Sequence, residues 1–254
     1  MKSTYVESTT IIGMALLAVS STVYAQTPQE IITRNQAVMK GAKTYQAVMS
    51  MTQNMGAQGS MMLNVEAKIA GKKSMMKISP TGQATGLMAM GAAMANVEVY
   101  NDGTKMITYM KSLNTYSEQP SKAGSSTPFD FTKSLTANSG SKWKLNGVVK
   151  VNGKDAFSLS LSMPAGKTGS TQTTNVFIAK SNYHLLKMTT VSKINAGPQG
   201  PMSMASELLV KSEKLNDPLS DSVFKFVPPS GAKLQSMKGM MGGMAGAVRA
   251  PKKK

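Results

Sequence analysis

The sequence predicts an α+β fold, in which one continuous domain is built from about ten antiparallel strands and two helices. Residues 60–69 and 155–163 alternate between apolar and polar side chains, and Asn-Gly or Asp-Gly pairs stand between such runs. A capped, amphipathic segment near the start predicts the first helix. A sheet of so many twisted strands is expected to curl or close rather than stay flat.

The first helix is expected over residues 28–42. Thr27 suits its N-cap, Pro28 suits the first helical position, and Glu30 stands where a capping box needs an acid. Apolar residues then recur at helical spacing. A second helix is expected over 128–138, where a threonine-proline pair repeats the same kind of start.

The two best strands, 60–69 and 155–163, each present one apolar and one polar face, as half-solvated antiparallel strands do. Weaker patterns of the same kind predict further strands at 43–52, 73–78, 96–101, 104–110, 114–118, 142–151, 172–179, 184–193 and 204–213. Turn residues separate them at 70–72, 101–103, 151–154 and 180–182.

Two stretches lack any period. Residues 79–95 consist mainly of Gly, Ala and Met, and residues 235–254 are rich in Gly and Met and close in three lysines. Both are expected to be mobile, the second as a basic tail. The expected domain between signal segment and tail therefore covers residues 26–234.

The first 25 residues have the pattern of a secretory signal peptide. Lys2 precedes an apolar run over 11–19, and the tripeptide Val23-Tyr24-Ala25 fits a signal-peptidase site before Gln26. The run is too short for a stable membrane span. An uncleaved anchor or a buried helix is the alternative. Export without any cysteine favours the periplasm of a bacterium.

Composition excludes several kinds of chemistry. The chain has no cysteine and one histidine, His184, so thiolate nucleophiles, iron–sulfur sites and multi-histidine metal sites are impossible. His184 is expected on a strand, exposed or hydrogen-bonded. Asp217 and Asp221 lie in a turn-like segment, and the sequence has no phosphate loop, dinucleotide fingerprint or nucleophile elbow. We therefore expect no catalytic residues, no metal site and no cofactor: the protein is not an enzyme.

Lysine and arginine number 29 against 12 acids, a formal charge of +17. Few aromatic residues interleave with these lysines, so nucleic acid is not the expected partner, whereas an anionic membrane surface is a possible one.

The 23 methionines admit two interpretations. Clusters at 88–94 and 237–244 suit Cu(I) binding, but adaptable apolar lining is the favoured interpretation.

The predicted domain ends in the segment Phe224-Lys225-Phe226-Val227-Pro228-Pro229-Ser230-Gly231-Ala232, preceded by residues 215–219, and residues 147–157 form an expected hairpin. Together these segments resemble the LolA/LolB-like lipoprotein-carrier superfamily. The resemblance covers about residues 28–234. It implies a strongly curved antiparallel sheet that forms an incomplete β-barrel, with helices as a lid over its apolar face. It also implies transport of lipoprotein acyl chains or other lipids through the periplasm, and some relatives sense signals instead.

The family's functional arginine on an early strand has no match here, since the arginines of the expected mature chain are Arg34 and Arg249. The expected ligand-lining residues share the apolar side of the alternating strands. They are Tyr45, Met49, Met51, Leu63, Val65, Ile69, Val97, Val99, Phe157, Leu159, Leu161, Val176, Ile178, Leu186 and Met188. A one-residue change of register would turn this set to the opposite face.

The sequence therefore predicts a monomeric, non-enzymatic periplasmic carrier that binds lipid or lipoprotein acyl chains. Residues 79–95 are the expected mobile segment over the binding face, and an inner- or outer-membrane protein is a possible partner. Two alternatives remain: an envelope sensory domain that uses the same face, and a methionine-rich Cu(I)-handling protein.

Overall fold

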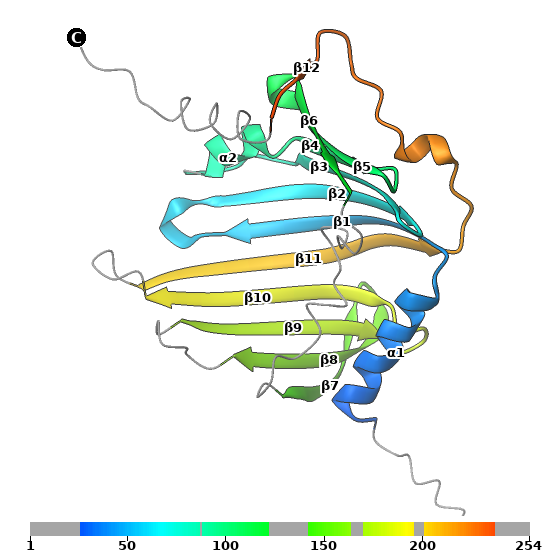
Figure 1. Cartoon of the computed structure of the whole chain (residues 1–254). Helices are drawn as coiled ribbons and strands as arrows, with labels where there is room; N and C mark the ends of the chain where they lie inside the picture. Colours follow the sequence, from blue (N-terminus) through cyan, green and yellow to red (C-terminus); the bar gives the residue numbers. More distant parts are fainter. Residues whose placement is uncertain (1–25, 87, 122–141, 164–169, 196–200, 237–254) are drawn as a thin grey trace, which may run out of the picture.

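A computed structural model describes residues 26–86, 88–121, 142–163, 170–195 and 201–236. The expected signal peptide, the expected helix at 128–138 and all but the first residues of the expected tail lie outside these ranges. The described chain forms one twelve-stranded sheet in the order β12-β6-β5-β4-β3-β2-β1-β11-β10-β9-β8-β7 (Figure 1). Neighbouring strands pair antiparallel, except for the short β12, which runs parallel to β6.

The strands are formed where the alternating patterns predict them. Their bounds are β1 (Thr44–Asn54), β2 (Ser60–Ala70), β3 (Lys73–Pro80), β4 (Val97–Asn101), β5 (Lys105–Met110), β6 (Thr115–Pro120), β7 (Trp143–Val151), β8 (Lys154–Met163), β9 (Thr171–Ala179), β10 (Leu185–Asn195), β11 (Pro201–Leu215) and β12 (Lys233–Leu234). The two-residue β12 has no sequence signal, because it belongs to the sheet only through its neighbour β6.

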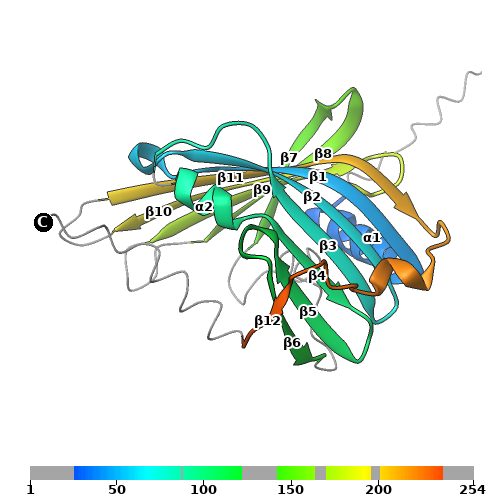
Figure 2. The ribbon, with the colours of Figure 1, turned by 90° about the horizontal axis from the view of Figure 1, so that it is seen from above.

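The sheet curves strongly but does not close. Figure 2 shows β3, β4, β5 and β6 bending away from the plane of the central strands, toward the side on which α1 lies. Within the described residues the first and last strands of the order, β12 and β7, do not pair with each other. The expectation of a curled antiparallel sheet is thus confirmed. We call the side that carries α1 the inner face and the opposite side the outer face.

The helix α1 (Pro28–Gly41) begins with the expected capping box. The Thr27 hydroxyl accepts a hydrogen bond from the Glu30 backbone N–H, and the Glu30 carboxylate accepts one from the Thr27 N–H. Ile31 and Ile32 are fully buried in the main apolar cluster of the inner face. In Figure 1, α1 lies across the ends of β7–β10.

Polar contacts with Tyr183 also hold α1 in place. Asn35 Nδ2 donates to the Tyr183 carbonyl oxygen at 2.7 Å, Arg34 Nη1 donates to the Tyr183 hydroxyl at 2.8 Å, and Tyr183 stacks on Phe157. The expected arrangement of several helices as a lid is not supported. Within the described ranges α1 is the one helix of more than two turns, and its apolar residues complete the core of the sheet rather than cover an open face.

The aperiodic segment 79–95, expected to be mobile, contains a second short helix, α2 (Met88–Met94). Met88 and Ala92, one turn apart, pack with Met61 and Leu63 of β2. The segment is also tied to β2 by backbone hydrogen bonds, such as the one from the Thr85 N–H to the Ser60 carbonyl oxygen. Ala- and Met-rich sequence favours a helix once such a surface is available.

The contact between this segment and the short turn before β2 requires glycine. A Cβ atom on Gly59 would lie 1.9 Å from the Thr85 carbonyl oxygen, and one on Gly86 would lie 2.4 Å from the Gln58 carbonyl oxygen. Both glycines also have positive φ angles. The backbone at Thr85 and Gly86 is in direct contact with the backbone at Gln58 and Gly59, which holds α2 close to the end of β2.

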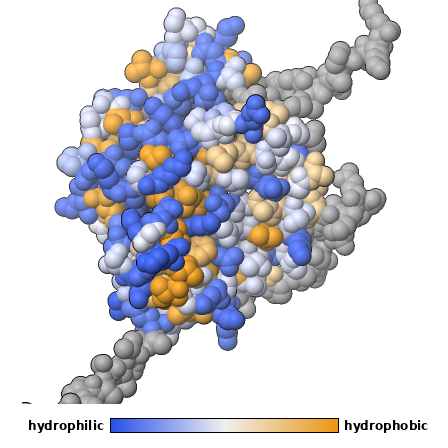
Figure 3. All heavy atoms as spheres, turned by 180° about the vertical axis from the view of Figure 1, so that it is seen from behind, coloured by the Kyte–Doolittle hydropathy of each residue, from blue (hydrophilic) through white to orange (hydrophobic). Residues whose placement is uncertain are grey.

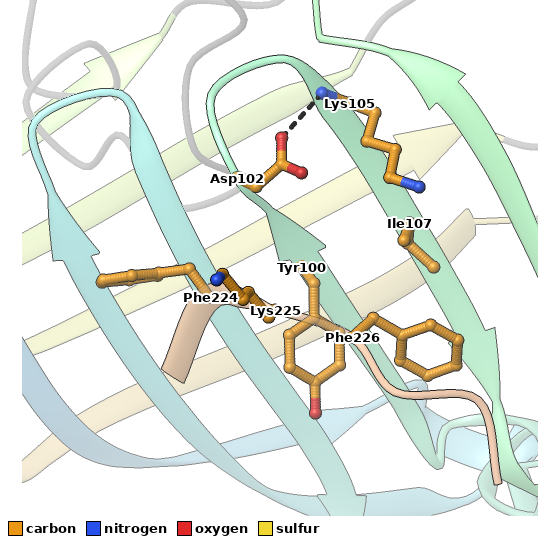
Figure 4. A pocket seen from close by; sticks show the side chains of 7 residues that line it. All are labelled: Tyr100, Asp102, Lys105, Ile107, Phe224, Lys225 and Phe226. Atoms are coloured by element: carbon orange, nitrogen blue, oxygen red, sulfur yellow. Dashed lines mark hydrogen bonds between the residues drawn. The ribbon is translucent and has the colours of Figure 1, made fainter. Parts of the chain in front are cut away.

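The outer face of β3–β6 is covered by the segment 221–234, which we call the strap (Figure 2). Phe224, at the end of a short 3-10 helix (Asp221–Phe224), is fully buried. The Phe226 ring lies 5.2–5.5 Å from the rings of Tyr100, Tyr109 and Tyr116. Between strap and sheet lies a pocket of about 240 Å³, lined by Tyr100, Asp102, Lys105, Ile107, Phe224, Lys225 and Phe226 (Figure 4).

The rest of the outer face is mainly polar. Viewed from behind, it presents hydrophilic side chains with apolar ones scattered among them (Figure 3). Ion pairs cross it, including Lys187 with Glu207 at 2.6 Å and Lys68 with Glu66 at 2.8 Å. Among the described residues, no helix combines the length and the apolar character that a membrane crossing requires.

The most enclosed carboxylate of this face, Glu98, makes stability depend on pH. Its side chain is 9% exposed, lies 2.7 Å from Lys111 Nζ and accepts a 2.7 Å hydrogen bond from the Tyr100 hydroxyl. Burial raises the pKa of Glu98, but hydrogen bonds from Lys111 and Tyr100 outweigh it, so that its pKa lies below the ordinary value of 4.5. A lowered pKa in the folded state means that the charged form stabilises the fold.

We therefore expect the free energy of unfolding to fall as the pH drops below about 4.5, through the lowered pKa of Glu98. Glu98→Gln should reduce this slope and cost about 1–3 kcal/mol near neutral pH. Urea titrations at a series of pH values measure both. The exposed Glu118→Gln serves as the control, and an equal loss of slope in that variant would contradict the assignment to Glu98.

Candidate ligand-binding face

The apolar inner face is one continuous surface. Its main cluster joins Ile31 and Ile32 of α1 to strands on both sides of β1. Eight expected lining residues are buried in this cluster, namely Tyr45, Met49, Val65, Phe157, Leu159, Leu161, Val176 and Ile178. Four more, Met51, Ile69, Val99 and Met188, are partly buried against it. The register confirms one shared face, because Met49 pairs with Val65 and Val176 pairs with both Leu159 and Met188.

A second cluster continues this surface under α2. It contains the expected residue Leu63 together with Met61 and Ala92. Met51 and Ile78 pack against both clusters and remain partly exposed. Val97 lies on the same face, opposite Ile78, and is also only partly buried. The inner face is therefore apolar from α1 to α2, and its middle is the least covered part.

Leu186 lies on the outer face instead of the expected inner one. It packs with Val151, Ala156 and Ala179 in a separate small cluster. The cause is a β-bulge in β10. The three residues 185–187 of β10 lie opposite only two residues of β9, Ile178 and Phe177. The extra residue shifts the alternation, so that Leu185 takes the inner position that the pattern assigned to Leu186.

One polar cluster interrupts the apolar inner face near α1. The Tyr45 hydroxyl is hydrogen-bonded to the Glu213 carboxylate, which also lies 2.7 Å from Nδ1 of His184. Burial raises the pKa of Tyr45 far above its ordinary value, and the charge of Glu213 and the hydrogen bond to it raise it further. Tyr45 therefore stays protonated at neutral pH. His184 has a polar partner, as the sequence predicts, but it directly precedes β10 instead of lying on the expected strand.

Other candidate chemistry is dispersed. Asp217 pairs with Lys214 at 3.4 Å, whereas Asp221 pairs with Lys73 at 2.7 Å, so each carboxylate is held by its own lysine. In the described part of the chain, no group of three or more histidine, aspartate or glutamate side chains is arranged to hold a metal ion. Of the two methionine clusters, Met88 packs in the apolar cluster under α2, and residues 237–244 lie outside the described ranges.

Sequence reasoning missed a row of uncharged polar residues on the same inner face. Gln53, Thr174, Thr190 and Ser206 occupy inner positions at the end of the sheet away from α1. The signal was present, because Thr174 and Thr190 keep the alternation of Val176 and Met188. The alternation continues there with polar side chains, so a criterion of apolar residues does not detect the row.

Comparison with known proteins gives structural neighbours only. No protein-family model and no curated protein matches the sequence. Among solved structures, an uncharacterized conserved protein from Thermus thermophilus is 13% identical, with 83% of this chain and 99% of that chain covered and a TM-score of 0.47. The Mycobacterium tuberculosis lipoprotein LppX is 12% identical over 76% and 99% of the two chains, with a TM-score of 0.43.

A third solved structure is similar over much of the chain. It is a LolA superfamily protein from Nitrosomonas europaea, 14% identical over 80% of this chain and 99% of that chain, with a TM-score of 0.33.

Proposed function

We propose that this protein is an exported, non-enzymatic carrier that binds the acyl chains of lipoproteins or other lipids on the inner face of its sheet. The observation that supports it is the continuous apolar surface from α1 to α2. Met51 and Ile78, which belong to both clusters, stay partly exposed on it. The expected signal peptide supports export to a periplasm.

The chemistry of the face suits such a ligand. An acyl chain needs burial rather than directional contacts, and each buried methylene contributes about 0.8 kcal/mol. Methionine side chains are flexible and adapt to ligands of different shape. Met51 and Met188 flank the middle of the face, and Met61 of β2 packs with Met88 of α2. The face can therefore accept chains of different length without a dedicated site for each carbon.

The test is native mass spectrometry of protein purified from a bacterial periplasm, followed by lipid extraction. We expect a bound acyl-chain species at near-stoichiometric amount. Met51→Glu should reduce this ligand at least tenfold, because a charge is then placed in the apolar surface. Its partly exposed position should leave the fold intact, which circular dichroism checks.

Ser50→Glu is the matched control. Ser50 precedes Met51 on β1 but lies on the outer face, between Leu209 and Asn64 of the neighbouring strands. This variant should bind ligand as the unchanged protein does. A clean apo mass for the unchanged protein, with no uptake of added myristate or of added 1-monomyristoylglycerol, would show that the inner face is a filled core and would overturn the proposed function.

A further inference from the structure

A row of uncharged polar side chains crosses the inner face at the end away from α1. Gln53 of β1 pairs with Ser206 of β11, Ser206 pairs with Thr190 of β10, and Thr190 pairs with Thr174 of β9. The hydroxyl oxygens of Thr174 and Thr190 are 3.3 Å apart. The row thus presents three hydroxyl groups and one amide over four adjacent strands.

The change from polar to apolar occurs at one level across these four strands. The inner residue two positions closer to α1 is Met51 in β1, Leu208 in β11, Met188 in β10 and Val176 in β9. All four belong to the main apolar cluster or pack against it. On these four strands the inner face therefore changes sharply from apolar to polar, whereas Met61 of β2 and Leu161 of β8, which pair with the two ends of the row, remain in the apolar clusters.

A pocket of about 160 Å³ lies at the polar row. The residues that line it are Gln53, Asn54, Met55, Thr190, Ser192, Met204, Ala205 and Ser206. None of these eight carries a charge. The charged residues nearby in sequence, Lys187, Lys193 and Glu207, pair in register with outer-face residues. Among the described residues, the lining of this pocket thus offers hydrogen-bond donors and acceptors but no ion-pair partner.

This absence of charge is unusual in so basic a chain. The described residues 53–61, 79–86, 88–96, 194–195 and 201–206, which flank this end of the sheet, contain no Asp, Glu, Lys or Arg, although the whole chain has a net charge of +17. A carboxylate or phosphate that leaves water for such surroundings loses its hydration and gains no ion pair, which is costly. Hydroxyl groups of a ligand would exchange their hydrogen bonds with water for equivalent ones here.

From this juxtaposition we infer that the preferred ligand is an amphiphile with an uncharged, hydroxyl-bearing head group, of the glycerol or sugar kind. Its head lies on the row of Gln53, Ser206, Thr190 and Thr174, and its acyl chain runs along the apolar part toward α1. The inference rests on the proposed function and names the ligand class for the same face.

Equilibrium dialysis of the full chain tests this, with three probes that share one acyl chain: 1-monomyristoylglycerol, myristate and myristoyl lysophosphatidylglycerol, each kept monomeric. We expect the neutral probe to bind at least tenfold more tightly than either anion. Thr190→Val keeps the shape and removes the hydroxyl, and should weaken the neutral probe about fivefold while leaving myristate unchanged.

Thr189→Val is the control, because Thr189 is the adjacent threonine of β10, lies on the outer face and is hydrogen-bonded to Asn175. It should change neither affinity. Equal or tighter binding of the anions, or no effect of Thr190→Val, would overturn the head-group assignment while leaving the carrier function in place. Failure of all three probes to bind would overturn both proposals.

Discussion

The Leu159→Glu variant is expected not to fold. Leu159 is 0% exposed, and Leu145 of β7 and Val176 of β9 flank it in the main cluster beneath α1. An ionised carboxylate there has no partner, and a buried unpaired charge costs several kcal/mol, a large share of the roughly 5–15 kcal/mol that holds a typical domain together. Loss of the near-ultraviolet circular dichroism signal measures the effect.

Ser160→Glu is the control for this substitution. Ser160 is the next residue of β8 and points to the outer face, opposite Lys144 of β7. The new carboxylate stays near solvent and beside a lysine, so the free energy of unfolding from urea titration should change by less than about 0.5 kcal/mol. If both variants unfold, or neither does, the assignment of the two faces of β8 is wrong. Leu159→Ala, expected to cost about 2–5 kcal/mol, gives a folded variant for the same comparison.

Phe224→Ala is the second large effect, because it detaches the strap from the outer face. Phe224 is 1% exposed and lines the pocket shared with Tyr100 and Ile107. Removing a buried phenyl ring leaves a cavity and should lower the free energy of unfolding by about 3–5 kcal/mol. Urea denaturation followed by the signal of the neighbouring tyrosines measures this loss.

The matched control is Val227→Ala, three residues further along the strap. Its side chain is 80% exposed, so this variant should stay within about 0.5 kcal/mol of the unchanged protein. If Phe224→Ala were equally harmless, the strap would contribute nothing to the stability of β3–β6. A partial loss confined to Tyr100, Tyr109 and Tyr116 would instead show that the strap opens locally without global unfolding.

The strands were predictable because one-sided burial imposes a period of two that survives in the sequence. In β8 the apolar residues Phe157, Leu159 and Leu161 alternate with serines, and the structure buries the apolar ones under α1. The first helix was predictable for a similar reason, since its cap and its buried isoleucines are local features. The curvature of the sheet was predictable because a sheet of so many twisted strands curls, and because the family resemblance implies a curved sheet.

The remaining features depend on contacts that a local pattern does not contain. The bulge in β10 reversed the expected side of Leu186, because an extra residue in one strand is detectable only against its partner. Helix α2 forms from a segment without clear period, since the surface of Met61 and Leu63 selects its buried side. The polar row exists only as an alignment across four strands, so no single strand reveals it.

The place of β1 in the sheet has a consequence for how the chain reaches its folded state. One edge of β1 is satisfied early by the hairpin with β2, but the other waits for β11, where Tyr45 pairs with Leu215. During synthesis or export, which begin with the N-terminus, β1 therefore keeps one edge of unpaired backbone groups until β11 is available. The apolar side chains of β1 stay incompletely covered for the same time. Such long-range pairing makes folding slow and self-association the competing reaction. The refolding yield should accordingly fall as protein concentration rises, and a chaperone that shields this edge during export would benefit the protein most at that stage.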